Sequence, residues 1–170
     1  NLGRMLMDVC QHEEALYCYE RALAIEPDNK DYYADYIFIM DLTARKTFED
    51  SIAARRRYND ALVMPLMAEA LPHRNTLDPD RKLRIGYASA DMYQHSGALT
   101  WGGFVINHDR EQFHITLYSG TQKEDAMTER FKRAADTWYD IRDWSDDRLA
   151  VQVYTDEIDI LVDLATFTSG

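Results

Sequence analysis

The sequence predicts two structural classes in succession, a segment of α-helical hairpins and then an α/β segment built on a parallel sheet. Apolar and aromatic residues recur at helical spacing over residues 1–62, prolines interrupt residues 63–81, and short apolar runs alternate with amphipathic stretches over residues 82–170. Strands that alternate with helices favour a parallel sheet with right-handed crossovers. We therefore expect helical hairpins, a linker and an α/β unit over these three ranges.

The first helical pair follows the second part of the tetratricopeptide (TPR) repeat, a pattern of roughly 34 residues. The match begins with a Leu-Gly pair ending at Gly3, and the small residues Ala15 and Ala22 flank Tyr19 on the second helix. Small residues on one face allow close helix packing, and Pro27 is expected to end the helix. Because one repeat cannot bury its own apolar face, we expect further repeats earlier in the polypeptide.

A second helical pair follows. Residues 31–42 are amphipathic, and their apolar stripe consists of Tyr32, Tyr36, Ile39 and Met40. Thr47 is expected to cap the next helix, with acidic residues in its first turn. This pair has the pattern of a degenerate terminal repeat or a capping hairpin.

The α/β segment contains four apolar runs with strand character and three helical stretches between them. The expected strands are 83–88, 113–118, 138–141 and 158–164, and the expected helices are 97–107, 124–136 and one capped by Ser145. Ligands of such sheets bind beyond the carboxyl ends of the strands, which selects the loops 89–96 and 165–170. Neither loop carries GxGxxG or a Walker sequence, the usual means of gripping a nucleotide pyrophosphate.

Composition excludes several classes of partner. The formal net charge of −11 argues against nucleic acid and against an anionic membrane, because both need clustered cations. The basic run Arg55-Arg56-Arg57 lies late in an expected helix, where it complements the helix dipole. The two cysteines form no metal-ligand spacing and suit a reducing compartment, so we expect no metal and a cytoplasmic location.

Four motifs, in order behind the TPR segment, carry a resemblance to a known family. They are KLRIGYASADMYQHS, FHITLYSG, TWYDI and IDILVDL. With the repeat, they make the chain similar to the O-GlcNAc transferase/SPINDLY-like family in its bacterial form. The resemblance implies a GT-B transferase with two Rossmann-like lobes, of which residues 82–170 would be part of the N-terminal lobe.

The family resemblance also implies an activity. Its members are inverting transferases that move a sugar from a nucleotide donor to Ser or Thr of polypeptides, which the TPR superhelix guides to the cleft. The donor is UDP-GlcNAc in the main branch and GDP-fucose in the SPINDLY branch, so the donor stays open. No cofactor or metal is expected. The nucleotide-binding groups are expected beyond residue 170, and this stretch alone is expected to be inactive.

The resemblance selects His95 as the candidate catalytic residue, a proton acceptor or hydrogen-bond partner in the cleft. The alternative role is a histidine that hydrogen-bonds the loop backbone and shapes the cleft. Candidates to line the cleft or contact the acceptor are Asp91, Gln94, Thr166, Phe167 and Thr168. The chain departs from the family pattern at Met92, usually aromatic, and at Thr166 and Phe167, where bacterial members often have Gly and His.

Two other functional classes stay open. The first is a TPR interaction scaffold whose transferase lobe is degenerate and non-catalytic. The second is an unrelated α/β protein, such as a hydrolase or a receiver-like domain, although the chain has no G-x-S-x-G nucleophile turn. Fold alone does not separate these classes, since one fold hosts many functions.

Overall fold

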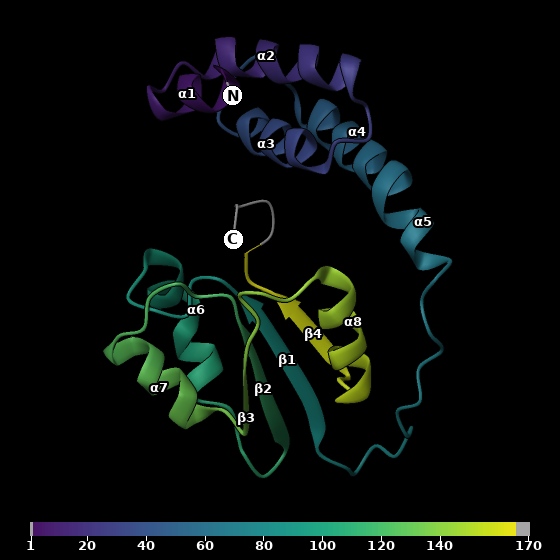
Figure 1. Ribbon diagram of the computed structural model, residues 1–170, viewed down its shortest axis with the longest axis vertical. Coiled ribbons are helices and arrows are strands. Elements are labelled where there is room, and N and C mark those ends of the chain that lie inside the picture. Colours follow the sequence, from purple (N-terminus) through teal and green to yellow (C-terminus); the bar gives the residue numbers. More distant parts are fainter. Residues whose placement is uncertain (1, 166–170) are drawn as a thin grey trace. The chain divides into compact units, whose positions relative to one another are not determined.

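The computed structural model describes residues 2–165 and divides into two compact units, one that ends at Ala70 and one that starts at Leu71 (Figure 1). The first unit is helical. Its elements are α1 (Leu2–Asp8), α2 (His12–Ile25), α3 (Lys30–Met40), α4 (Phe48–Tyr58), the π-helical turn η1 (Asn59–Val63) and α5 (Met64–Met67). The expected linker over residues 63–81 is therefore wrong at its start, because the chain stays helical through Pro65.

The TPR residues pack where the repeat pattern puts them. Ala15 and Tyr19 are buried on α2, and a Cβ atom at Gly3 would lie 2.8 Å from the Tyr19 ring. The Tyr19 hydroxyl donates a hydrogen bond of 2.7 Å to Asp35 on α3, so one aromatic side chain ties three helices together. Burial, together with this bond to a carboxylate, raises the pKa of Tyr19. Helix α2 ends at Ile25, just ahead of Pro27.

Side-chain caps define the helix starts in this unit. Asn29 accepts hydrogen bonds from the first backbone amides of α3. Thr47 caps α4, as the sequence predicts, and Asp50 completes a reciprocal capping box with it. Such caps satisfy amides that have no partner within the helix, at about 1 kcal/mol each.

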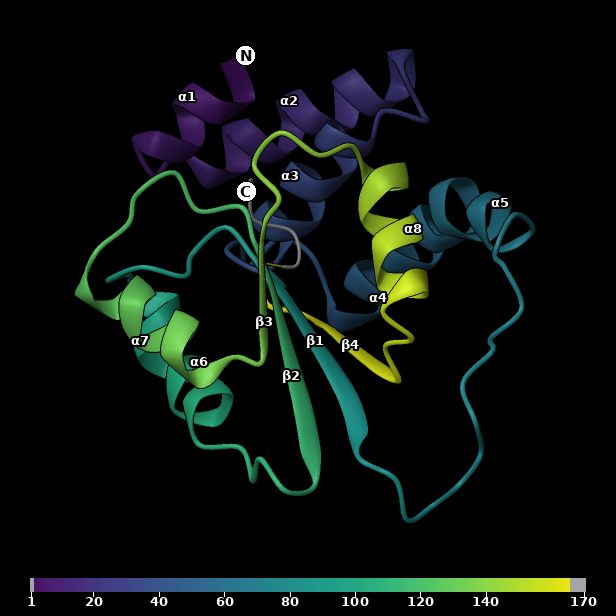
Figure 2. The ribbon, with the colours of Figure 1, turned by 60° about the horizontal axis from the view of Figure 1, so that its bottom comes forward.

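The second unit is a four-stranded parallel sheet in the order β3-β2-β1-β4, with helices on both faces (Figure 2). Its elements are β1 (Leu83–Ser89), α6 (Ser96–Ile106), β2 (Phe113–Ser119), α7 (Ala126–Ala134), β3 (Thr137–Asp140), α8 (Asp146–Thr155) and β4 (Ile160–Asp163). Strand β4 starts later than the apolar run from residue 158 predicts. The amide of Ile158 bonds to Val153 at the end of α8, so this residue still belongs to the helix terminus.

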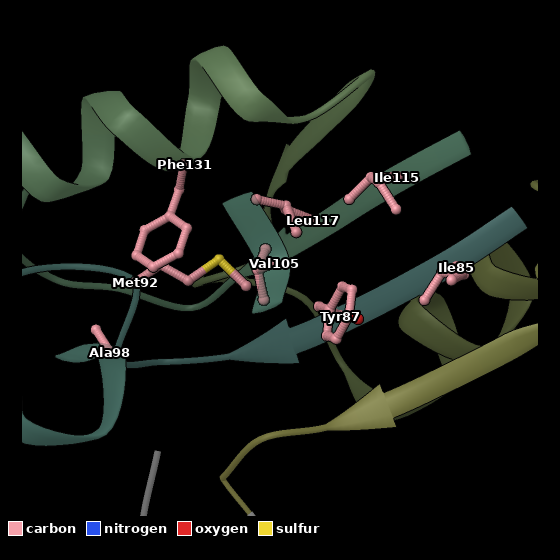
Figure 3. Packing of buried hydrophobic residues seen from close by; sticks show 8 residues of the cluster. All are labelled: Ile85, Tyr87, Met92, Ala98, Val105, Ile115, Leu117 and Phe131. Atoms are coloured by element: carbon pink, nitrogen blue, oxygen red, sulfur yellow. The ribbon is translucent and has the colours of Figure 1, made fainter. Parts of the chain in front are cut away.

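Helices α6 and α7 cover one face of the sheet, and the main core lies beneath them (Figure 3). The core consists of Ile85, Tyr87, Met92, Ala98, Val105, Ile115, Leu117 and Phe131. Gly102 permits close contact between the two helices, because a Cβ atom there would lie 3.0 Å from the Phe131 ring. The glycine that weakens α6 as a helix is therefore the residue that lets α7 pack.

Helix α8 covers the opposite face, where a polar cluster holds it. Tyr118 and Tyr139 stack with ring centroids 5.5 Å apart. Their hydroxyls donate to the carboxylate of Asp156 at distances of 2.6 and 3.2 Å. Burial and the neighbouring carboxylate raise the pKa of Tyr118, so its hydroxyl stays a donor.

The extended segment ahead of β1 is fixed to the α/β unit by Asp159. Arg81 donates to both oxygens of this carboxylate, at 2.6 and 2.5 Å. Asn75 donates to it at 2.6 Å, and the backbone amide of Arg84 at 2.8 Å. The Arg81 guanidinium is the main cause that lowers the pKa of Asp159. Residues 75–81, expected to be linker, are thus hydrogen-bonded to the α/β unit.

Candidate functional site

The loop after β1 occupies the position where such sheets usually bind ligands. All four strands are parallel, so they end at one edge of the sheet. From β1 the chain adds β2 and then β3 on one side, and it returns to place β4 on the other side of β1. Strand β1 is therefore the topological switch point, and the loop that leaves Ser89 opens at its carboxyl end.

His95 lies at the end of this loop and caps helix α6. Its Nδ1 accepts a hydrogen bond of 3.2 Å from the amide of Gly97, and its backbone oxygen accepts one from Leu99. The side chain is 40% exposed, and its ring centroid lies 5.5 Å from that of Tyr93. His95 is thus at the carboxyl edge with an accessible ring, and it also caps α6, a role that sequence analysis did not predict for this residue.

Asp91 is the second side chain of this loop that faces the imidazole. Its Oδ2 lies 3.5 Å from Nδ1 of His95, and its backbone amide donates to the Ser89 hydroxyl. When Nδ1 accepts from Gly97, the neutral ring carries its proton on Nε2 and offers a donor. When Nδ1 carries the proton, it faces Asp91 and Nε2 becomes an acceptor. With Asp91 beside it, His95 can therefore act either as a proton acceptor or as a hydrogen-bond donor, the two roles expected of a histidine in the cleft.

Gln94 enters the site through its backbone. Its side chain is exposed, and its amide donates a hydrogen bond of 2.7 Å to Oδ2 of Asp125 at the start of α7. Met92, two residues earlier, is fully buried in the core, and its carbonyl oxygen accepts 2.8 Å from the hydroxyl of Thr128. Met92 is thus a core residue of this chain.

Sequence reasoning missed Asp125 and Thr128. Together they form the capping box of α7, in which each side chain accepts from the other residue's backbone amide. The signal was present as an acidic residue followed three positions later by a hydroxyl residue ahead of an amphipathic stretch. The hydrogen bond from the Gln94 amide is the main cause that lowers the pKa of the Asp125 carboxyl.

The exit of β4 runs beside the exit of β1. The amide of Leu164 donates to the oxygen of Ala88, and the amide of Ala165 donates to the side chain of Asp163. The candidates Thr166, Phe167 and Thr168 lie outside the described residues.

Two further histidines of this unit have partners away from the loop. Nε2 of His108 lies 2.7 Å from the Tyr87 hydroxyl, and burial lowers the pKa of His108. Nε2 of His114 lies 3.3 Å from the Thr137 hydroxyl. Within residues 2–165 there is no group of three or more His, Cys, Asp or Glu side chains arranged to hold a metal ion. The same residues include no helix that is long and apolar enough to cross a membrane.

Similar proteins come from plants. A rice (Oryza sativa subsp. japonica) protein named probable UDP-N-acetylglucosamine–peptide N-acetylglucosaminyltransferase SPINDLY is 29% identical over 156 residues, 89% of this chain and 17% of that protein. A barley (Hordeum vulgare) protein of the same name is 30% identical over 86% of this chain and 16% of its own length. An Arabidopsis thaliana protein named probable UDP-N-acetylglucosamine–peptide N-acetylglucosaminyltransferase SEC is 29% identical over 53% of this chain and 9% of its own length. The chain thus spans a small part of these relatives.

A solved structure resembles both units. A mutant of the O-GlcNAc transferase from Thermobaculum terrenum superposes with a TM-score of 0.84 and 27% sequence identity, over 95% of this chain and 31% of that chain. No family profile matches the chain.

Proposed function

Since this chain belongs, over the stretch that it shares with these relatives, to the O-GlcNAc transferase/SPINDLY-like family, we propose that it is part of an inverting protein O-glycosyltransferase. The complete enzyme moves a sugar, GlcNAc from UDP-GlcNAc, to Ser or Thr hydroxyls of polypeptides. One observation carries this proposal: the likeness to an O-GlcNAc transferase structure extends over 95% of the chain, through the helical hairpins and the sheet alike.

The proposed chemistry needs three contributions. A serine hydroxyl is a weak nucleophile at neutral pH, so its proton must find an acceptor as the bond to the anomeric carbon forms. The acceptor and donor must lie in line, and the departing diphosphate must be stabilised. A single displacement of this kind inverts the anomeric centre without a covalent enzyme intermediate. We propose that groups of the enzyme itself stabilise the departing diphosphate, with no cofactor or metal.

His95 supplies the first contribution in this proposal. Its ring is exposed at the carboxyl edge, and Nδ1 has both an amide and a carboxylate within reach. With the proton on Nδ1 the ring accepts at Nε2, and with the proton on Nε2 it donates to the acceptor or the donor sugar. Oδ2 of Asp91, 3.5 Å from Nδ1, is the partner of the form that carries the proton on Nδ1. The diphosphate-binding groups belong to the part of the enzyme that follows residue 170.

The helical unit is proposed to hold the polypeptide acceptor. Its TPR-type hairpin, with Tyr19 at the centre of the packing, is the unit from which TPR superhelices are built by stacking. The groove of that superhelix guides the acceptor toward the cleft. We also propose a cytoplasmic location, which suits the free thiols of Cys10 and Cys18.

Mass spectrometry of acceptor peptides tests the function. The intact protein is incubated with a peptide library and with UDP-GlcNAc or GDP-fucose in separate reactions. The expected result is addition of N-acetylhexosamine to Ser or Thr from UDP-GlcNAc. Addition of deoxyhexose would keep the transferase but reassign the donor. Modification by neither donor would favour the alternative, a TPR scaffold with a degenerate lobe, to which the departures at Thr166 and Phe167 point.

A further inference from the structure

The capping box of α7 bonds to the loop that carries His95. Within the box, Oδ1 of Asp125 accepts from the amides of Met127 and Thr128, at 2.8 and 3.1 Å. The other oxygen, Oδ2, accepts the amide of Gln94 at 2.7 Å. The two oxygens of one carboxylate therefore serve two elements that are far apart in the sequence.

The second residue of the box makes a parallel connection. Thr128 is fully buried, and its hydroxyl accepts from the amide of Asp125 while it donates to the carbonyl oxygen of Met92 at 2.8 Å. Met92 lies in the core against α6 and α7, close to Phe131 (Figure 3). Without Thr128 this carbonyl would lose its hydrogen-bond donor in a water-poor site, which costs about 1–3 kcal/mol.

These contacts act on three of the four loop residues from Met92 to His95. Met92 is fixed by burial and by its carbonyl, Gln94 by its amide, and His95 by its cap on α6. The backbone just before the imidazole thus has little freedom, although the loop lies at the surface. A helix cap alone requires none of the bonds that cross to this loop.

We propose that Asp125 and Thr128 are positioning residues, which hold the backbone of the loop so that the His95 ring stays aimed into the cleft. The inference rests on the proposed transferase function, in which His95 touches the reacting groups. Misplacement of a catalytic group by about 1 Å can cost on the order of a hundredfold in rate, so loss of either contact is expected to reduce turnover.

Asp125→Asn separates the cap from the positioning role. Asparagine is as good an N-cap as aspartate, so one amide oxygen keeps the α7 bonds. Its NH₂ group, however, cannot accept a hydrogen bond from Gln94. Ser145→Ala is the matched control, because the Ser145 hydroxyl caps α8 by accepting from the amide of Arg148, and this hydroxyl makes no other hydrogen bond among those described. It removes a whole cap in the same unit without touching the loop.

Thr128 offers a conservative pair of variants. Thr128→Val keeps the volume and removes the hydroxyl, whereas Thr128→Ser keeps the hydroxyl and loses one methyl group. A purely structural role would make both variants less stable and leave turnover below the melting temperature unchanged. A positioning role predicts that turnover falls in Thr128→Val and stays at the wild-type level in Thr128→Ser.

The experiment measures kcat, KM for the nucleotide sugar, melting temperature and the His95 ring C–H signal by NMR, in the intact protein. We expect Asp125→Asn and Thr128→Val to lower kcat roughly tenfold with nearly unchanged KM, and to shift the His95 signal. Thr128→Ser and Ser145→Ala should resemble the wild type in kcat and in the His95 signal. Wild-type kcat and an unmoved His95 signal in Asp125→Asn and Thr128→Val would overturn the inference, as would equal losses in Thr128→Ser. If the wild type itself transfers no sugar, the proposed function fails, and the NMR signal still decides whether these residues position His95.

Discussion

Oδ2 of Asp91 lies 3.5 Å from Nδ1 of His95, the nitrogen that also accepts the amide of Gly97. The amide requires a lone pair on that nitrogen, and the carboxylate favours a proton there. Each tautomer of the imidazole therefore has a partner in place. This arrangement makes His95 the side chain of the loop on which we expect turnover to depend most.

We expect His95→Ala in the intact enzyme to lower turnover at least roughly tenfold, because it removes the group that accepts or donates the proton. Initial rates of sugar transfer to a peptide, measured with saturating donor, provide the test. His73→Ala is a suitable control, since His73 is exposed and precedes the sheet. Unchanged turnover in His95→Ala would remove this residue from the mechanism.

Two neighbouring glycines of α6 should respond to alanine in opposite ways. Gly102→Ala would place a methyl group 3.0 Å from the buried Phe131 ring, and we expect the free energy of unfolding to fall by about 1–2 kcal/mol. A Cβ atom at Gly103 meets nothing within 4 Å, so Gly103→Ala should gain about 1 kcal/mol of helix propensity. Urea denaturation of both variants checks the prediction. Equal effects would show that α6 and α7 do not pack as described.

Helix α8 ends with a residue in the left-handed region. Glu157 has φ of 51°, and its amide bonds to Tyr154 while the next amide bonds to Val153. This is the Schellman pattern, in which glycine is the favoured residue. We expect Glu157→Gly to raise the unfolding free energy by about 0.5–1 kcal/mol, because glycine adopts this conformation without the steric cost. Thermal melting measures this change in stability. Glu157→Ala, which keeps the Cβ atom, should not raise the unfolding free energy.

The bonds at Asp159 predict a pH-dependent stability. Its side chain is 10% exposed and its folded-state pKa lies below the usual value, so its contribution is complete above the unfolded pKa and is lost as pH falls through the folded pKa. We expect Asp159→Asn to cost about 2–3 kcal/mol at neutral pH. The difference from the wild type should shrink as the pH falls below about 4.

Asp140→Asn is the control for this series. Arg142 lowers the pKa of Asp140 to about 2, yet the pair is exposed, at 46% for Asp140 and 39% for Arg142. Exposed pairs contribute less than about 1 kcal/mol. Chemical denaturation at several pH values compares the two variants, and a larger loss at Asp140 than at Asp159 would contradict the prediction.

Local patterns predicted most of the elements. The apolar runs of strands β1 and β2 gave their ranges to within one residue. Each strand extends by one buried serine, Ser89 or Ser119, and these two serines are paired in the sheet. The run from residue 158 gave a wrong start for β4, since Ile158 is apolar and buried but its backbone closes α8. Pro65 suggested a linker, although proline is tolerated in the first turn of a helical segment such as α5.

The contacts of the site were harder to predict than its position. The loop with Asp91 and His95 follows from the switch point of the sheet, which strand and helix alternation already implies. The bond from Gln94 to Asp125 spans 31 residues, and the bond from Thr128 to Met92 spans 36. Such pairs depend on how α7 packs, which no periodicity in a single sequence encodes.

The carboxylate of Asp159 also limits where a shortened version of the protein can begin. Residues ahead of the first strand look dispensable in a sequence diagram, yet Asn75 and Arg81 supply donors to this carboxylate, and Arg74 stacks on Tyr154 with its guanidinium 4.4 Å from the ring centroid. A shortened version that began at Leu83 would leave a mostly buried anion without those donors. An expression boundary for the sheet unit therefore belongs ahead of Arg74, near the division at Leu71.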